Sequence, residues 1–260
     1  MKKTNNIIKD SLNPRILDPQ APFAIREAFN LLRTNLMYTI ADNDSGAPVF
    51  AVTSPNEAAG KSTVITNLAI SFAQLDQKVL LIDADLRCPV LHDYFGFDSK
   101  HQGLSELISG ISKDVIVKDV RPNLDLITSG RIPPNPSELI TSPRFASCLD
   151  KWKKEYDIIF VDFPPIGIVS DSVANCKSIS GYIFTVRSGR STAKSINNSI
   201  ETMEKLGAKI LGVVLNDYNL KGSGYYKRRS ARYKYYSKSR SKYEQLAEQN
   251  SAEKANSSDK

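Results

Sequence analysis

Residues 54–63 read SPNEAAGKST and lie between an apolar run and a stretch of helical periodicity. The segment ends in Gly60, Lys61 and Ser62, as a phosphate-binding loop does, but Pro55 stands where the motif G-x-x-x-x-G-K-[ST] has its first glycine. In such loops, backbone N–H groups at a helix start bind phosphate oxygens, the lysine reaches the β- and γ-phosphates, and the hydroxyl binds Mg²⁺. We therefore expect a nucleotide-binding loop; the alternative is an ordinary strand–turn–helix with a chance Gly-Lys-Ser.

Two further apolar runs end in carboxylates. The run LLID ends at Asp83, with Asp85 two residues on, and the run IIFVD ends at Asp162. Carboxylates at the end of a buried strand need a nearby cation or a bound proton to be tolerated. Each also has an ordinary structural explanation, such as a helix cap for Asp85 or an ion pair between Asp83 and Arg87. Together with Lys61, the three acids are better explained by a magnesium–nucleotide site.

The elements that must position these residues alternate along the chain. Apolar, β-branched runs without polar alternation are separated by segments of helical periodicity, the pattern of a mostly parallel α/β sheet with helices on both faces. Ligands bind such sheets at the carboxyl ends of the strands, where the loop and the acids fall. We predict strands at 48–54, 78–83, 124–129, 156–162, 181–187 and 209–216, and helices at 21–40, 60–76, 134–155, 171–178 and 191–207.

Composition narrows the class of protein. The chain has 260 residues, enough for one sizeable core, and its 41% hydrophobic and 24% charged residues are typical of soluble globular proteins. The sequence has no apolar run of about 18 residues, which a membrane span needs, and its start lacks the apolar core of a secretory signal. The scattered cysteines favour reduced thiols, and two histidines are too few for a histidine-based metal site.

The positive charge is concentrated at the C-terminus. Residues 221–260 hold eleven Lys or Arg and four Asp or Glu, a net charge of +7, so the other 220 residues hold 24 of each sign. We predict a folded domain over 1–220 and a flexible basic tail over 221–260. By composition alone, basic residues mixed with aromatics favour a nucleic-acid tail first, and a tail on anionic lipid second. The tail tyrosines are Tyr225, Tyr226, Tyr233, Tyr235, Tyr236 and Tyr243.

Four longer strings carry a family resemblance: LLIDADLRCPVLHDYF, GLSELISG, ITSGRIPPNPSELITSP and YDIIFVDFPPIGIVSD. They resemble the bacterial tyrosine kinases of capsule and exopolysaccharide systems, the CpsD/CapB family. The similarity runs from about Arg26 to Asn216, and a tyrosine-rich tail belongs to the same pattern. The resemblance implies a P-loop NTPase fold and transfer of the γ-phosphate of ATP to tyrosines, chiefly on the protein's own tail. Autophosphorylation thereby becomes the preferred interpretation of the six tail tyrosines.

The resemblance also implies a role for each candidate residue. Lys61 and Ser62 correspond to the Walker A pair, Asp83 and Asp85 to the Walker A′ acids, and Asp162 to the Walker B acid, with Asp83 the candidate base for the tyrosine hydroxyl. The implied catalytic residues are Lys61, Asp83 and Asp85. The implied ATP-binding residues are Ala59, Gly60, Lys61, Ser62, Thr63 and Asn216. The implied Mg²⁺ ligands, direct or through water, are Ser62, Asp85 and Asp162.

Two positions near these motifs depart from the family pattern. Glu57-Ala58 replaces a Pro-Gly pair in the loop, and because alanine resists positive φ, we expect a distorted loop or weaker nucleotide binding. Phe163 stands where a threonine or serine usually follows the Walker B acid, and the sequence offers no physical reason for it.

The partners implied by the resemblance are a membrane adaptor or activator of the polysaccharide system, a tyrosine phosphatase and other copies of the chain, but no nucleic acid. The chain would then be cytoplasmic and peripheral at the inner face of the membrane, held there by the adaptor. In the family the copies form a ring through a Glu-x-x-Arg-x-x-Arg motif. Here that motif is Glu27, Asn30 and Arg33, one arginine short, on what we expect to be an exposed helix face.

Two other functions share the same motifs. A ParA/MinD-type positioning ATPase would use the basic tail as an anchor on DNA or membrane, but its loop carries a signature lysine where Asn56 stands here. A degenerate regulatory module would hold nucleotide without catalysis. The tyrosine cluster favours the kinase over both.

Overall fold

The computed structural model describes residues 16–18, 20–39, 46–99, 101–173 and 175–218, so the predicted tail and its tyrosines lie outside the described residues. Among the described residues, those outside 22–27 belong to one compact unit. The elements, in chain order, are α1 (Phe23–Met37), β1 (Val49–Thr53), α2 (Lys61–Ala73), β2 (Val79–Asp83), α3 (Leu91–Tyr94), α4 (Leu104–Ser109), β3 (Val117–Arg121), β4 (Leu124–Ile127), α5 (Pro136–Thr141), α6 (Pro143–Trp152), β5 (Ile158–Asp162), the 3₁₀ turns η1 (Ser170–Val173) and η2 (Cys176–Ser178), β6 (Gly181–Arg187), α7 (Ala193–Lys205) and β7 (Ile210–Asn216).

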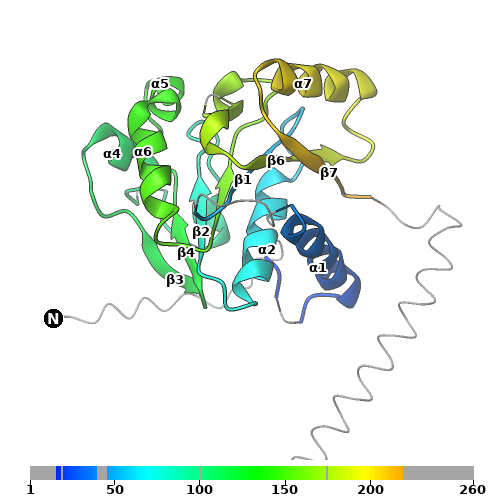
Figure 1. The fold of residues 1–260 in the computed structure, drawn as a ribbon, viewed down its shortest axis with the longest axis horizontal. Coiled ribbons are helices and arrows are strands. Elements are labelled where there is room, and N and C mark those ends of the chain that lie inside the picture. Colours follow the sequence, from blue (N-terminus) through cyan, green and yellow to red (C-terminus); the bar gives the residue numbers. More distant parts are fainter. Residues whose placement is uncertain (1–15, 19, 40–45, 100, 174, 219–260) are drawn as a thin grey trace, which may run out of the picture. The chain divides into compact units, whose positions relative to one another are not determined.

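This unit is built on a seven-stranded sheet in the order β3-β4-β2-β5-β1-β6-β7 (Figure 1). Every neighbouring pair from β4 to β7 is parallel, and only the edge strand β3 runs antiparallel, to β4. The predicted class, a mostly parallel sheet with helices, is confirmed, and all six predicted strands are present. The sequence did not predict β3, because its polar residues and the following Pro122 give no apolar run.

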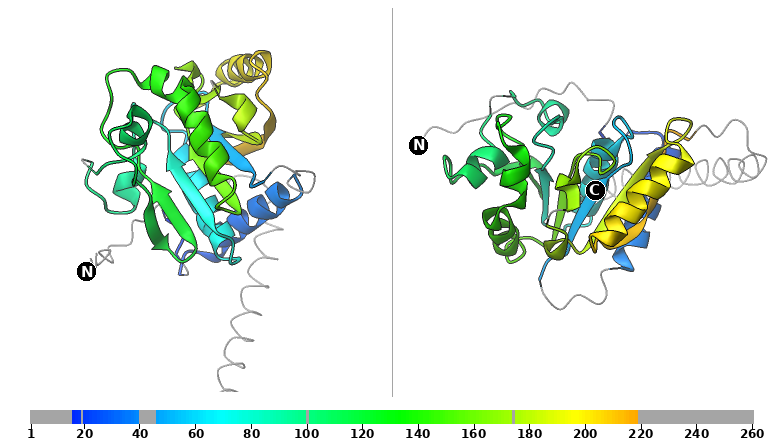
Figure 2. Two further views of the ribbon diagram at one scale, coloured as in Figure 1. Left: turned by 60° about the vertical axis from the view of Figure 1, so that its left-hand side comes forward. Right: turned by 90° about the horizontal axis from the view of Figure 1, so that it is seen from above.

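Alternate residues of each strand face two separate cores. In β1, Val49 and Ala51 point toward a cluster that includes residues of α5, α6 and α7. Phe50 and Val52 belong to the other cluster, which holds the buried face of α2 and residues of α3. Helices accordingly cover both faces of the sheet (Figure 2). The central strands β1, β2 and β5 are buried along their whole length, which is why their sequences show no polar alternation.

Two predicted helices are broken in the structure. The segment 134–155 forms α5 and α6, because Ser142 is extended (ψ 146°) and caps α6 by accepting a hydrogen bond from the Phe145 N–H. The segment 171–178 forms the short turns η1 and η2 instead of an α-helix. Within the described ranges, no helix is both long enough and apolar enough to cross a membrane.

Candidate nucleotide site

A cleft of about 690 Å³ opens where β1, β2, β5, β6 and β7 end. The phosphate-loop segment forms one wall, and the segments that follow the other strands form the rest. The lining residues are Glu57, Ala58, Gly60, Lys61, Ser62, Thr63, Asp85, Arg87, Cys88, Val90, Tyr94, Pro164, Pro165, Ile168, Val169, Arg187, Asn216 and Asp217. The carboxyl ends of the parallel strands therefore do form a ligand-sized site, at the edge where the sequence predicted it.

The loop from Pro55 to Gly60 has the backbone of a helix-start phosphate loop. Gly60, the N-cap of α2, has φ 89°, and a Cβ at this position would lie 1.9 Å from Asn216 Nδ2. The same Asn216 amide donates a hydrogen bond to the Ala59 carbonyl at 2.9 Å, so the end of β7 is hydrogen-bonded to the loop. Ala58 takes φ 54° despite its side chain. Residue 58 is therefore left-handed although it is an alanine and not a glycine. The replacement of Pro-Gly by Glu57-Ala58 appears in the structure as local strain at Ala58.

The entry of the loop is fixed by the segment after β5. The Thr53 hydroxyl donates to the Pro164 carbonyl at 2.8 Å and accepts from the Ile166 N–H at 3.0 Å. Gly167 is so close that a Cβ there would lie 2.0 Å from the Pro55 carbonyl oxygen. Any side chain at residue 167 would therefore push against the start of the loop.

Behind the loop, the ends of β2 and β5 place two carboxylates side by side. Asp83 and Asp162 are register partners and are 0% and 1% exposed. Within the described part of the chain, no contact to either carboxylate oxygen of Asp162 has full hydrogen-bond geometry, and the Ser62 hydroxyl makes only a weaker interaction with this carboxylate. Burial raises the pKa of Asp162 to about 6, although the Lys61 ammonium and the Ser62 hydroxyl nearby act to lower it. The pKa of Asp83 is held well above its usual value, mainly by burial and then by the charge of Asp162.

The segment after β2 folds around these acids. Asp83 accepts hydrogen bonds from the backbone N–H groups of Asp85 (3.2 Å) and Leu91 (3.0 Å), which accounts for both of its oxygens. Asp85 lines the cleft and accepts from the backbone N–H groups of Arg87 (3.3 Å) and Cys88 (3.0 Å). The two acids are therefore not equivalent: Asp83 supports the segment from beneath, and Asp85 faces the cleft.

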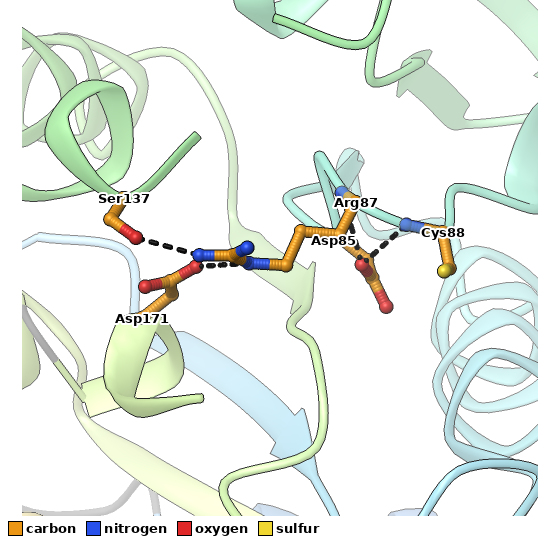
Figure 3. Close-up of polar contacts among 5 residues, drawn as sticks. All are labelled: Asp85, Arg87, Cys88, Ser137 and Asp171. Atoms are coloured by element: carbon orange, nitrogen blue, oxygen red, sulfur yellow. Dashed lines mark hydrogen bonds and ion pairs between the residues drawn. The ribbon is translucent and has the colours of Figure 1, made fainter. Parts of the chain in front are cut away.

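Arg87 ties this segment to two other elements, as Figure 3 shows. Its Nε donates to Asp171 of η1 at 2.9 Å, and its Nη2 donates to Ser137 of α5 at 2.7 Å. The Asp171 side chain is only 7% exposed, so Arg87 also neutralises a nearly buried charge. The sequence offered Arg87 only as a possible ion-pair partner of Asp83. In the structure its side-chain partners are instead Ser137 and Asp171, which lie 50 and 84 residues away in the chain.

These acids fit a magnesium ion bound together with phosphates. No group of three or more His, Cys, Asp or Glu side chains within the described ranges forms a metal site alone. Mg²⁺ usually needs only one or two carboxylates, because phosphate oxygens and water complete its octahedron. The buried oxygens of Asp162, which lie close to Lys61 and Ser62 but lack a hydrogen bond of full geometry, are the observation that favours this fit.

The predicted site residues gather in this region, at two depths. Gly60, Lys61, Ser62, Thr63, Asp85 and Asn216 line the cleft. Ala59, Asp83 and Asp162 lie behind its wall and are almost fully buried. Arg187 and Tyr94 also line the cleft, and no sequence pattern pointed to either. The Tyr94 and Thr63 hydroxyls form a hydrogen bond of 2.8 Å. The roles assigned to all these residues remain predictions.

The structure explains the other departures from the family pattern. Phe163 is fully buried in the core and stacks edge-on against Phe145 with ring centroids 6.5 Å apart, so its side chain serves packing and leaves the cleft unaffected. Asn30 and Arg33 are half-buried, and Arg33 donates a hydrogen bond to the Ser71 carbonyl of α2. The expectation that this motif lies on the exposed face of the helix was therefore wrong.

Comparison with known proteins places the chain in a class and then in a family. Residues 50–237 match the CobQ/CobB/MinD/ParA nucleotide binding domain, called CbiA, so the chain belongs to this class of nucleotide-binding domains. Tyrosine-protein kinase CpsD of Streptococcus agalactiae serotype III is 36% identical over 195 residues, which cover 74% of this chain and 82% of CpsD. The putative tyrosine-protein kinase CapB of Staphylococcus aureus is 33% identical over 223 residues, which cover 84% of this chain and 96% of CapB. The chain belongs to this family of bacterial tyrosine kinases.

Solved structures agree with this assignment. The kinase domain of the Escherichia coli tyrosine kinase ETK superposes with a TM-score of 0.72 at 36% identity, covering 76% of this chain and 77% of that one. The septum site-determining protein MinD of Pyrococcus horikoshii, solved with Mg-ADP, has a TM-score of 0.57 at 23% identity and covers 68% of this chain. MinD thus shares the fold and is a more distant relative.

Proposed function

We propose that this chain binds Mg-ATP in the cleft and transfers the γ-phosphate to tyrosine hydroxyls, including those of its own tail. The observation that carries the proposal is the cleft of this chain, in which Lys61 and Ser62 lie close to the buried carboxylate of Asp162. At 1% exposure and without a hydrogen bond of full geometry, this carboxylate is costly to the fold, and a bound cation would compensate it.

Each side chain has a separate task in this proposal. The ammonium of Lys61 neutralises phosphate charge, and the backbone N–H groups at the start of α2 bind phosphate oxygens. Ser62, Asp85 and Asp162 hold Mg²⁺ directly or through water. When bound, the ion supplies charge neutralisation at the β- and γ-phosphates. Phosphoryl transfer needs mainly positioning and charge stabilisation, so this short set of residues is sufficient.

The proton of the tyrosine hydroxyl goes to one of the two Walker A′ acids. Asp83 stays our predicted base, and its raised pKa suits a proton acceptor. Its side chain is fully buried, and each of its oxygens already accepts one backbone hydrogen bond, from Asp85 or Leu91. A tyrosine reaches Asp83 only if the segment 85–91 shifts; without such a shift Asp85, which lines the cleft, takes the proton.

The proposal includes the cellular setting implied by the family. The chain would act at the inner face of the cell membrane, with a membrane adaptor as activator and a tyrosine phosphatase to reverse the modification. It would assemble as a homo-oligomer, without nucleic acid as a partner. The half-buried Asn30 and Arg33 indicate that any assembly contact would differ from a simple exposed motif.

One experiment separates the kinase from a positioning ATPase and from an inactive nucleotide-binding module. The full chain is incubated with Mg-ATP, with and without the cytoplasmic segment of a cognate adaptor, while phosphotyrosine and released phosphate are measured. We expect phosphotyrosine in excess of free phosphate. Phosphate release without phosphotyrosine would instead favour the ATPase, and bound ATP with neither product would favour the inactive module.

A further inference from the structure

One arginine contacts both the phosphate loop and the residue that follows β7. Arg187, the last residue of β6, donates from Nη1 to the Ala58 carbonyl oxygen at 3.0 Å. Its Nε and Nη2 reach Asp217 Oδ2 at 3.0 and 2.9 Å. Asp217 follows the end of β7 and comes directly after Asn216, which holds the next loop carbonyl, that of Ala59.

Both residues that the Arg187 guanidinium contacts have a left-handed backbone, which is strained for alanine and better tolerated by aspartate. Ala58 has φ 54° and Asp217 has φ 55°, and only five non-glycine residues within the described ranges have positive φ. An alanine in this left-handed region is strained, because its Cβ lies too close to the following carbonyl oxygen. Nothing in the chemistry of alanine favours this backbone, so a contact outside the residue must hold it there.

We propose that Arg187 is a positioning residue that holds the phosphate loop ready for nucleotide by fixing the strained Ala58. The guanidinium donates a hydrogen bond to the Ala58 carbonyl oxygen, and the Asp217 carboxylate fixes the orientation of the guanidinium. The energy that holds Ala58 in its left-handed conformation then comes from contacts of the folded protein before nucleotide binds. Nucleotide binding does not have to provide that energy. Without Arg187, Ala58 relaxes to negative φ, and nucleotide must restore the loop at the expense of its own affinity.

The proposal deepens the proposed function by naming what compensates the missing loop glycine. It rests on the cleft being a nucleotide site, but not on tyrosine phosphorylation. The binding of ADP with Mg²⁺ is therefore the first readout, because it needs no phosphoryl transfer and is independent of whether the chain proves to be a kinase.

The test is a double-mutant cycle on the full chain, with Arg187→Met, Ala58→Gly and the double variant, by calorimetric titration of ADP with Mg²⁺. Arg187→Met should weaken binding about tenfold, the equivalent of the strain at one left-handed alanine. Ala58→Gly alone should change affinity by less than about threefold, because the loop is already held. In the double variant, glycine should restore affinity to within about threefold of the parent, since it adopts positive φ freely.

Two controls match the two substitutions. Arg190→Met removes one positive charge from the same segment, at an exposed residue absent from the cleft lining, and should leave affinity unchanged. Asp76→Gly relieves a positive φ of 58° just after α2, away from the cleft, and should fail to rescue Arg187→Met. In the phosphorylation assay, Arg187→Met should raise the KM for ATP about tenfold with kcat little changed.

Three results would overturn the proposal. If glycine at residue 58 does not rescue Arg187→Met, the arginine does not act through the Ala58 backbone. If Arg190→Met loses as much affinity, the effect is one of general charge. If Arg187→Met lowers the melting temperature with unchanged ADP affinity, the contacts serve the fold alone.

Discussion

Replacing Asp162 with asparagine should make the nucleotide-free protein more stable. The carboxylate is 1% exposed, and neither oxygen has a hydrogen bond of full geometry within the described part of the chain. Its pKa is raised from 3.8 to about 6, which at about 1.4 kcal/mol per pKa unit corresponds to a penalty of about 3 kcal/mol for the charged form. The buried amide that replaces it costs about 1–2 kcal/mol in turn, so we expect a net gain of about 1–2 kcal/mol at pH 7.5.

The pH dependence gives this prediction its sign. The folded state holds the Asp162 proton up to about pH 6, whereas the unfolded chain loses it near 3.8, so ionisation opposes folding. The parent's unfolding free energy therefore falls between these two values, and the full penalty is present above the folded pKa. The advantage of Asp162→Asn should be absent near pH 4, grow up to about pH 6, and stay level above it.

Urea denaturation at pH 4, 5, 6 and 7.5, without nucleotide or metal, measures this difference. Asp150→Asn is the matched control, because Asp150 is 66% exposed in an ion pair with Lys153 and should change stability by less than about 0.5 kcal/mol. Added Mg-ADP should stabilise the parent more than Asp162→Asn. A variant that is less stable than the parent at pH 7.5, or equally stable at every pH, refutes the argument that a buried charge without a full hydrogen bond is held here for ion binding.

Three further substitutions or treatments test other parts of the account. Lys61→Met should abolish phosphotyrosine formation while circular dichroism and the melting temperature stay close to the parent's; unchanged phosphotyrosine would remove Lys61 from the site. Arg87→Met should lower the unfolding free energy in urea by about 1–3 kcal/mol, because it leaves the Asp171 carboxylate charged at 7% exposure. Lys151→Met is the control, because the Lys151 side chain is 74% exposed in its ion pair and its loss should cost almost nothing. Equal effects of the two substitutions would contradict the difference in burial. Phosphorylation should release the chain from anionic vesicles, because residues 221–260 carry +7 and each phosphate adds about −1.5 to −2, so about four phosphates cancel the charge; lipid co-sedimentation that stays unchanged after four or more tail phosphates would reject this switch.

The sequence predicted the parts of this protein that have a simple local signature. Buried strands such as β1 and β5 are continuous apolar runs, and the acids that end them fall at the carboxyl edge of a parallel sheet by topology alone. The edge strand β3 was missed because its sequence, VKDVR, is mostly charged, whereas the other edge strand, β7, is an apolar run that the sequence does reveal. The contacts of Arg87 and Arg187 could not be predicted, because they join segments that are 30 to 129 residues apart in the chain.

Two positions that depart from the family pattern could be explained only from the structure. Alanine at residue 58 suggested a distorted loop, yet the loop keeps a left-handed residue because contacts from outside hold it. Phe163 had no explanation from the sequence, because the core that receives it is assembled from distant helices such as α6. In both cases the reason lies in tertiary contacts that no local pattern records.

Residue-resolved mapping of phosphotyrosine tests the central claim most directly. The full chain and its Lys61→Met variant are each incubated with Mg-ATP and an adaptor's cytoplasmic segment, and every tyrosine is then quantified by mass spectrometry. The account predicts phosphate on the cluster from Tyr225 to Tyr243 in the parent and none in the variant. A parent chain that binds ATP, with the adaptor segment bound as well, and still carries no phosphotyrosine would contradict it.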